Sequence, residues 1–334
     1  MGKKFHLSKR AGIGLFCTAA LIIAVLTLLH TNPLADPQDE FYKKIIACLL
    51  IVAACVIFIR FYDKITSLPV ELYENRQLIW RLARNDFKKR YAGSYLGMVW
   101  ALAQPVVTVV MYWFVFDNFF GQKAQLVSYG IEMPYVLYLT AGLVPWFYFT
   151  EAWQNGTTAL LEYNYLVKQV VFKISILPII KIVAATFVHL FFVVVMLAVA
   201  AMYGVYPTIY TIQIIYFSAC MFFFILGLSY ATCALVIFFR DLTQIIAIFL
   251  QVGMWATPIL WNITMLDDKP VLLRIIKLNP LVYIVNGYRS ALVEQTWFFE
   301  DFYSTIYFWI VTVAIFGLGA LIFKRLKPQF ADVL

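Results

Sequence analysis

The sequence predicts an all-α integral membrane protein with eight membrane-spanning helices. Hydrophobic residues make up 63% of its 334 residues, and charged residues only 13%. A soluble protein of this length cannot bury so much apolar surface, so the bilayer must solvate most of the chain. A helix needs roughly 20 apolar residues to cross about 30 Å of hydrocarbon. The segments that qualify are Ala11–His30, Ile45–Tyr62, Gly97–Phe116, Pro134–Ala152, Leu177–Tyr203, Ile212–Phe238, Ile245–Trp261 and Thr305–Phe323.

The first apolar segment follows Lys3, Lys4, Lys9 and Arg10, a pattern shared by signal peptides and membrane anchors. No small-x-small cleavage pattern precedes a mature domain, and a second apolar segment follows after a short polar stretch. We therefore expect an uncleaved transmembrane hairpin over residues 1–65. A cleaved signal peptide is the alternative.

The net charge of +8 is distributed along the chain in a way that sets its orientation. When the N-terminus is placed inside, most of the 26 Lys and Arg residues fall in segments on the cytoplasmic side. This bias predicts a topology with both termini in the cytoplasm. The basic charge is thereby explained by orientation and membrane-surface chemistry, and no nucleic-acid partner is expected.

The sequence contains no convincing catalytic, metal or cofactor site. The five cysteines all lie in apolar segments without CxxC spacing, which is typical of small buried side chains. The three histidines are too scattered for a metal triad, and no GxxxxGK[ST] motif occurs. We therefore expect neither a bound cofactor nor ATP hydrolysis by a P-loop in this chain.

The polar region over residues 66–95 predicts an amphipathic helix that lies in the inner membrane interface. Its apolar face consists of Leu72, Ile79, Leu82, Ala83 and Phe87. Its polar face consists of Glu74, Gln77, Arg81, Arg84 and Lys88. The alternative is a plain juxtamembrane anchor without a specific ligand.

The remaining residues, 96–334, contain six of the predicted spans. The inner loop over residues 160–173 is long enough for a short helix. The outer segment over residues 262–304 is too hydrophobic for a solvated loop. It predicts two short helices, broken at Asn279-Pro280, that dip back toward the membrane.

Four motifs follow one another along this second part of the chain. The first comprises Arg90, Tyr91, Gly93, Ser94, Leu96, Gly97, Trp100 and Pro105; the others are FRDLTQ (239–244), LNPLVYIVNGYRSAL (278–292) and KPQFADVL (327–334). With them, the chain from about Glu71 to Leu334 resembles the membrane subunits of ABC-type polysaccharide exporters, the permeases for O-antigen, capsule and wall teichoic acid. These permeases usually have six spans, so the N-terminal hairpin is an addition.

The resemblance implies the membrane half of an ATP-driven exporter in the bacterial cytoplasmic membrane. The cargo would be a lipid-linked polysaccharide, carried on undecaprenyl pyrophosphate. The chain would form a homodimer with two copies of a separate ATPase subunit, which would bind ATP and Mg. The surrounding membrane lipids complete the expected partners.

The resemblance also suggests roles for particular residues. The basic helix would bind the lipid pyrophosphate through Arg81, Arg84, Lys88, Lys89 and Arg90, since arginine forks bind phosphate oxygens bidentately. The ATPase-coupling residues would be Leu166, Lys168, Val170, Phe172, Arg240 and Asp241. The outer gate would include Asn279, Pro280, Tyr288 and Arg289.

Aromatic residues make up 18% of the chain, and flat rings can stack on the C–H faces of sugars. Interfacial aromatic belts account for many of them. The residues that we expect to line the polymer path are Tyr112, Trp113, Trp146, Tyr148 and Trp153.

Two charged or titratable residues fall inside predicted spans. We expect Lys181 to extend its side chain to the inner interface, and His189 to be neutral and hydrogen-bonded rather than part of a proton relay. Three other functions remain open: an ABC permease for a smaller lipid or drug-like substrate, a membrane glycosyltransferase using Asp267 and Asp268, and an ion-coupled secondary transporter.

Overall fold

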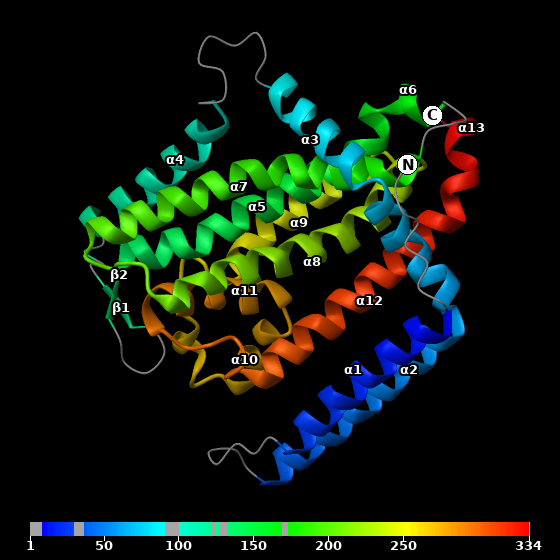
Figure 1. Ribbon diagram of the computed structural model, residues 1–334. Coiled ribbons are helices and arrows are strands. Elements are labelled where there is room, and N and C mark those ends of the chain that lie inside the picture. Colours follow the sequence, from blue (N-terminus) through cyan, green and yellow to red (C-terminus); the bar gives the residue numbers. More distant parts are fainter. Residues whose placement is uncertain are drawn as a thin grey trace. The chain divides into compact units, whose positions relative to one another are not determined.

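The computed structural model describes residues 9–29, 37–90, 100–119, 121, 124–126, 132–168 and 173–333. The chain forms two compact units; the first ends at Arg76 and the second begins at Gln77. Helices dominate both units (Figure 1). In the described residues, the only strands form one antiparallel pair, which the sequence did not predict.

The first unit is a helical hairpin of α1 (Lys9–Leu29) and α2 (Pro37–Glu74). The rings of Phe16 and Phe58 stack with centroids 3.9 Å apart, and the Lys9 ammonium lies 2.5 Å from the Asp63 carboxylate. The backbone of α2 leaves helical geometry at Phe61 (φ −112°, ψ 20°), which kinks the helix. These contacts join the two segments for which the sequence predicts a transmembrane hairpin, and the crossing of the membrane by both stays a prediction.

The second unit begins with α3 and contains all remaining elements. Its longer helices are α3 (Arg76–Arg90), α4 (Trp100–Trp113), α5 (Tyr135–Glu162), α7 (Leu177–Met202), α8 (Gln213–Val236), α9 (Leu242–Ala256), α10 (Pro270–Lys277), α11 (Pro280–Arg289) and α12 (Phe302–Leu326). Its short elements are the π-helices η2 (Phe114–Phe119) and η7 (Ser290–Glu294), the 3-10 helices η4 (Ile174–Ile176), η5 (Ile209–Ile212), η6 (Ile263–Leu266) and η8 (Lys327–Gln329), and the single turns α6 (Asn164–Val167) and α13 (Phe330–Val333). The strands are β1 (Ala124–Leu126) and β2 (Glu132–Pro134), with Gln125 opposite Met133.

Five described segments are both long and apolar enough to cross a bilayer: Lys9–Leu29, Lys44–Asp63, Ile174–Met202, Ile209–Val236 and Phe302–Gln329. Val106–Phe116 and Leu242–Ala256 are shorter apolar helices. Helix α5 has 28 residues but is not among the five. The structure thus confirms a multi-pass helical membrane protein, and the count of eight spans stays a prediction.

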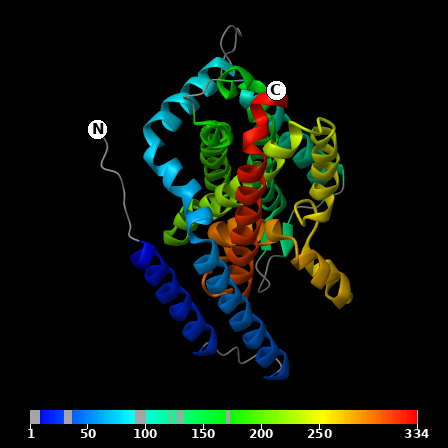
Figure 2. The same cartoon turned by 90° about the vertical axis from the view of Figure 1, so that its right-hand side faces the viewer.

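The core of the second unit forms where α5 packs along α7 and α8, and where α12 packs along α8 (Figure 2). Glycines allow the last pair to approach closely. A Cβ atom added to Gly319 of α12 would collide with the backbone carbonyl oxygen of Gly227 in α8. Small residues at such positions let helix backbones touch, which is the usual device for packing helices in a membrane.

Two predicted boundaries can be compared with the structure. The outer segment contains two short helices, α10 and α11, and the chain breaks between them at Asn279-Pro280 as predicted. The Asn279 side chain caps α11 by accepting a hydrogen bond from the Leu281 amide at 3.0 Å, and Pro280 occupies the first turn. The single interfacial helix expected over 66–95 is instead divided: residues up to Glu74 continue α2, Asn75 forms a turn, and α3 follows.

Candidate functional site where α3, α5 and α7 meet

Helix α3 has one buried and one basic face, as its sequence predicts. Ile79 and Ala83 are buried, whereas Arg81, Arg84, Lys88 and Lys89 are exposed. The side chain of Arg90 and the small-residue joint formed by Gly93, Ser94 and Gly97 lie outside the residues that the structure describes. The exposed side of α3 therefore presents at least four cations within about two and a half turns.

Aromatic packing attaches α3 to the membrane-spanning helix α7. The ring of Phe187 contacts Trp80 and Phe87, with centroid distances of 5.2 and 5.6 Å. Trp80 and Phe87 are seven residues apart, so they lie two turns apart on the same side of α3. This contact fixes which face of α3 is turned toward the bundle.

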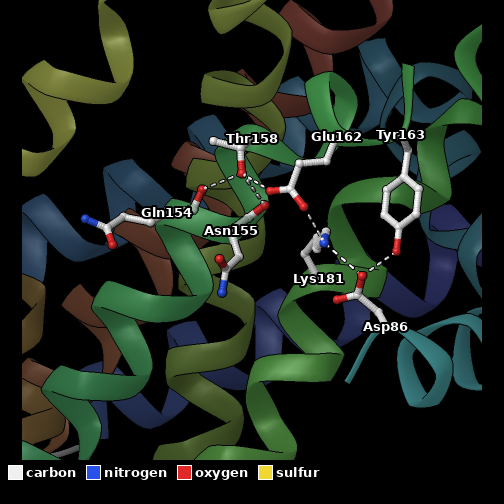
Figure 3. Close-up of polar contacts among 7 residues, drawn as sticks. All are labelled: Asp86, Gln154, Asn155, Thr158, Glu162, Tyr163 and Lys181. Atoms are coloured by element: carbon white, nitrogen blue, oxygen red, sulfur yellow. Dashed lines mark hydrogen bonds and ion pairs between the residues drawn. The ribbon is translucent and has the colours of Figure 1, made fainter. Parts of the chain in front are cut away.

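A buried group of charges joins α3 to the ends of α5 and α7 (Figure 3). The Lys181 ammonium lies 2.8 Å from Oδ1 of Asp86 and 2.7 Å from Oε2 of Glu162. The Tyr163 hydroxyl donates a hydrogen bond to the same Asp86 oxygen at 2.5 Å. Thr158 donates to the other Glu162 oxygen at 2.7 Å. We call Asp86, Glu162, Tyr163 and Lys181 the charge cluster.

Burial differs sharply within the charge cluster. The side chains of Lys181 and Asp86 are only 7% and 11% exposed, whereas that of Glu162 is 48% exposed. The buried pair therefore experiences weak solvent screening, and the outer ion pair strong screening. Burial and the adjacent Asp86 carboxylate raise the pKa of Tyr163, so its hydroxyl stays protonated and able to donate.

The charge cluster was not predicted from the sequence. Lys181 was expected to extend toward the interface; the structure shows it buried between the carboxylates of Asp86 and Glu162, a pairing that was not predicted. Asp86 lies 95 positions earlier in the chain, and nothing in the sequence distinguishes it from the other charged residues of its polar helix. The available signal was the cost of a lone lysine inside an apolar segment, which demands a partner somewhere in the fold.

The predicted coupling segment follows this cluster directly. Helix α5 ends at Glu162, and α6 forms a single turn in which Leu166 is partly exposed and Val167 is buried. Lys168 is exposed, whereas Val170 and Phe172 lie outside the described residues. The segment expected to contact the ATPase therefore begins next to the charge that holds α3.

The C-terminal turn packs close to the start of α7. The Lys327 ammonium lies 3.2 Å from the Ser175 hydroxyl, and Phe330 packs its ring on Phe238 and Phe323. Phe238 lies just after the end of α8, beside the turn that carries Arg240 and Asp241, and both of these charged residues are exposed. The predicted coupling residues Arg240 and Lys168 are thus both accessible at this end of the unit.

The predicted gate residue Arg289 is buried near the other end of α5. Its guanidinium lies 3.5 Å from the centroid of the Tyr138 ring and donates to the carbonyl oxygens of Ile259 at 3.1 Å and Tyr138 at 3.4 Å. Asn279 donates to the Thr257 hydroxyl at 2.9 Å. Together, these bonds fasten α11 to the segment that follows α9.

Tyr288 belongs to a separate buried polar network. Its hydroxyl lies 2.7 Å from the Ser218 hydroxyl and 3.0 Å from Nε2 of His189. The ring of Tyr148 stacks on His189 at 4.4 Å. His189 is hydrogen-bonded within the core, in agreement with the packing role expected for it.

The five aromatic residues predicted for the polymer path fall into two groups. Trp146, Tyr148 and Trp153 are buried inside the protomer; the Trp153 ring, for example, packs on Phe249 of α9. Tyr112 and Trp113, at the end of α4, are partly exposed. A ring enclosed by its own helices contributes to the core, whereas Tyr112 and Trp113 keep part of their surface exposed.

The fold and the site define a multi-pass membrane protein in which a basic surface helix is held to a helical bundle. The sequence matches the family described as ABC-2 type transporter over residues 77–293, and the chain belongs to this family. It is a membrane permease that does not itself hydrolyse ATP, and its family implies an ATPase subunit as partner.

Two similar proteins are both described as O-antigen export system permease protein RfbA. The protein from Myxococcus xanthus is 26% identical over 262 residues, which cover 78% of this chain and 97% of that protein. One from Klebsiella pneumoniae is 28% identical over 257 residues, which cover 76% of this chain and 93% of that protein. The similarity therefore extends over nearly the whole length of each relative.

Proposed function

We propose that the chain is the membrane subunit of an exporter that moves a lipid-linked polysaccharide outward across the bacterial cytoplasmic membrane. The observation that carries the proposal is its similarity to two O-antigen export permeases over 97% and 93% of their lengths. The exposed cations of α3 add the chemistry that an anionic lipid carrier requires.

In this proposal the end of the second unit that carries α3 and α6 faces the cytoplasm, as do both termini. The basic residues of α3 then lie at the inner membrane interface, where the positive-inside bias places them. Two copies of the chain form the path between them, and two ATPase subunits bind ATP and Mg. In this proposal the ATPase subunits, rather than this chain, supply the nucleotide sites.

The lipid carrier would be recognised through its pyrophosphate group. Arg81 and Arg84 would form bidentate bonds to phosphate oxygens, and Lys88, Lys89 and Arg90 would add positive charge. Four of these side chains are exposed on one helix, so they can reach a headgroup without rearrangement of the core. Undecaprenyl pyrophosphate is the carrier that we propose.

Force from the ATPase would enter through residues 160–173 and through the turn containing Arg240 and Asp241. The charge cluster provides a physical route from there to α3, because Glu162 and Asp86 share one lysine. Leu166 and Lys168, with Val170 and Phe172, would contact the ATPase. A displacement of the end of α5 would therefore change the forces on the headgroup helix.

The outer end would be closed by residues 262–304, with α11 as the main element. Asn279 and Pro280 would set the start of α11, and Arg289 would hold its far end against Tyr138 and Ile259. We propose that Tyr112 and Trp113 line the path. Trp146, Tyr148 and Trp153 would instead stabilise the protomer.

The test is the ATPase activity of the purified permease–ATPase complex with increasing undecaprenyl-pyrophosphate glycan. We expect stimulation, and we expect Arg84→Ala/Lys88→Ala to raise the half-maximal glycan concentration at least about tenfold, since one charge-assisted hydrogen bond contributes about 1.5–3 kcal/mol. The matched control is Arg274→Ala/Lys277→Ala, which removes two exposed cations from α10.

Each outcome of this titration has a defined meaning. An unchanged titration in the α3 variant would reduce α3 to a membrane anchor, with the exporter retained. Stimulation by a short lipid or drug-like compound, but not by the glycan lipid, would favour the permease for smaller substrates. Failure of the chain to associate with any ATPase would contradict the proposal.

A further inference from the structure

The last two described elements, η8 and α13, are attached to the bundle by contacts to which the proposed function assigns no role. Phe330 is fully buried, with centroid distances of 5.4 Å to the Phe323 ring and 6.4 Å to the Phe238 ring. The exposed residues of the same two elements are Pro328, Gln329, Asp332 and Val333. Phe330 therefore supplies the main apolar attachment here, because aromatic rings bury more surface than other side chains.

The attachment continues from Phe323 to the start of α7. The Phe323 ring packs edge-on against Tyr230 of α8, with centroids 5.2 Å apart, and the Tyr230 hydroxyl donates to the Ser175 carbonyl oxygen at 2.7 Å. The Lys327 ammonium donates to the Ser175 hydroxyl at 3.2 Å. Tyr230 and Ser175 are buried, so water competes little for these bonds. We call Ser175, Tyr230, Phe323, Lys327 and Phe330 the brace.

The brace lies between the two segments that the proposed function assigns to the ATPase contact. The first, residues 160–173, ends just before Ser175. The second is the turn of Arg240 and Asp241, and it begins just after Phe238, on which Phe330 packs. Figure 1 shows α6 and α13 at the same end of the second unit. The brace thus connects the end of one ATPase-contact segment to the start of the other.

The turn that contains Arg240 must follow any movement of Phe238. The Phe239 amide donates to the Leu235 carbonyl oxygen at 3.0 Å, and the Leu242 amide donates to the Phe239 carbonyl oxygen at 3.2 Å. These bonds run from the end of α8 to the start of α9. They leave the turn little conformational freedom of its own.

Helices α7 and α9 begin at the two ATPase-contact segments. Helix α7 follows η4 directly, and α9 follows the turn of Arg240 and Asp241. In the described part of the chain these two helices have no extensive contact with each other and pack instead on α5 and α8. A displacement of one segment therefore reaches the other through packed side chains and hydrogen bonds. The brace supplies such contacts at the end where both helices begin.

We propose that Phe330 is a positioning residue for ATP-driven transport. Its ring contacts with Phe238 and Phe323 hold the two ATPase-contact segments at a fixed separation. The bond from Lys327 to Ser175 secures the same arrangement. Closure of the ATPase subunits then displaces α7 and α9 together, instead of being absorbed by bending between them. The proposal rests on the exporter function above and adds the residues that maintain the geometry of its ATPase contact.

The first test measures the separation of the two segments in the purified permease, without ATPase or glycan. Nitroxide labels at Lys173→Cys and Asp241→Cys, two exposed positions, report the distance by pulsed electron paramagnetic resonance, in a chain whose five cysteines are replaced by alanine. We expect one narrow distance in this parent chain and in the matched control Gln329→Ala, which changes the exposed residue beside Phe330. In Phe330→Ala we expect a broader distribution or a second distance.

Two further variants separate positioning from a general loss of folding. Phe330→Leu retains a buried apolar side chain and should keep the narrow distance. Lys327→Met leaves the ring contacts in place and removes the bond to Ser175, so it should broaden the distance less than Phe330→Ala. If Phe330→Ala does not purify as a folded protein, Lys327→Met decides the test alone. Unchanged distances in the folded variants would overturn the inference.

The second test is the ATPase activity of the permease–ATPase complex with and without undecaprenyl-pyrophosphate glycan. We expect Phe330→Ala to lower the ratio of stimulated to basal activity at least about twofold, the lower end of the range for mutations along a coupling network. The affinity for the ATPase should be unchanged, because Phe330 is buried. A lowered unfolding temperature with an unchanged ratio would reduce Phe330 to packing and overturn the inference.

Failure of the proposed function is read separately. A parent complex that the glycan does not stimulate would contradict the exporter, whatever the distances show. A parent complex that is stimulated, together with distances that do not depend on Phe330 or Lys327, would retain the exporter and overturn only the positioning role.

Discussion

Replacement of Lys181 by methionine removes the cation that the charge cluster shares. Methionine keeps the length and apolar character of the lysine side chain, so the packing around α7 is largely retained. The Asp86 carboxylate, however, keeps its charge in a site where its side chain is only 11% exposed. The substitution therefore isolates the cost of a buried charge that has lost its counterion.

The structure gives the size of this effect. Removing one partner of a buried ion pair costs about 3–5 kcal/mol, because the remaining charge is left uncompensated. The second pair contributes little, since Glu162 is 48% exposed and exposed ion pairs contribute about 0–1 kcal/mol. We therefore expect Lys181→Met to weaken the attachment of α3 strongly and Glu162→Gln to weaken it slightly.

Hydrogen exchange of the α3 backbone amides measures this attachment directly. A loss of 3 kcal/mol in opening free energy accelerates exchange about 100-fold, at 1.36 kcal/mol for each factor of ten. The double variant Asp86→Asn/Lys181→Met should recover much of the protection, since both charges are then absent. Exchange in α12, which does not contact the cluster, provides the internal reference.

Two results would refute this reasoning. If Glu162→Gln accelerated exchange as much as Lys181→Met, burial would not control the strength of the two pairs. If the double variant exchanged faster than Lys181→Met alone, the lysine would not be neutralising Asp86, and another interaction would hold α3 in place.

Three further predictions follow from single sites. Arg289→Met should clearly lower the unfolding temperature of the purified protein, because it leaves the buried Ile259 carbonyl oxygen and the Tyr138 ring without their cation. Arg289→Lys should recover only part of this loss, since an ammonium group lacks the planar, forked donors of guanidinium. In α12, Gly319→Ala should destabilise the protein in detergent unfolding experiments, because the added Cβ atom would collide with a backbone carbonyl oxygen of α8. The control Gly317→Ala has open space around the added Cβ atom and should be neutral or stabilising. Equal effects of the two substitutions would contradict the close contact between α8 and α12. The pKa of Tyr163 is raised in the folded state, so the hydroxyl of the unfolded chain ionises first as the pH rises above about 10, the ordinary pKa of tyrosine. The free energy of unfolding of the wild type should therefore fall above that pH, and it should fall less in Tyr163→Phe, which pH-dependent unfolding experiments would measure. An identical fall in both proteins would mean that the pKa of Tyr163 does not change on folding.

The apolar runs and the breaks between them were sufficient to predict most of the fold. Segments near Leu177, Ile212 and Thr305 correspond to long apolar helices, and Asn279-Pro280 marks the predicted break because proline cannot continue a preceding helix. The strand pair was missed, since three-residue strands carry too little alternation to be recognised.

The candidate site was harder to predict than the spans. The two faces of α3 followed from a period of 3.6 residues, which is a local property of the sequence. The pairing of Lys181 with Asp86 joins residues 95 positions apart, and no local pattern specifies which acid meets which base. For the same reason, the sequence did not distinguish the buried Trp153 from a partly exposed aromatic residue such as Trp113.

The sequence by itself determined that this chain is a helical membrane protein with a basic amphipathic helix, because hydropathy and helical periodicity are properties of consecutive residues. The tertiary structure decided that Lys181 holds Asp86 and Glu162 together and that α5 turns Phe149 and Trp153 inward and Gln154 outward. These choices depend on which helices become neighbours. Neighbours are selected by packing and by the need of each buried charge for a partner, and both act between residues far apart in the chain.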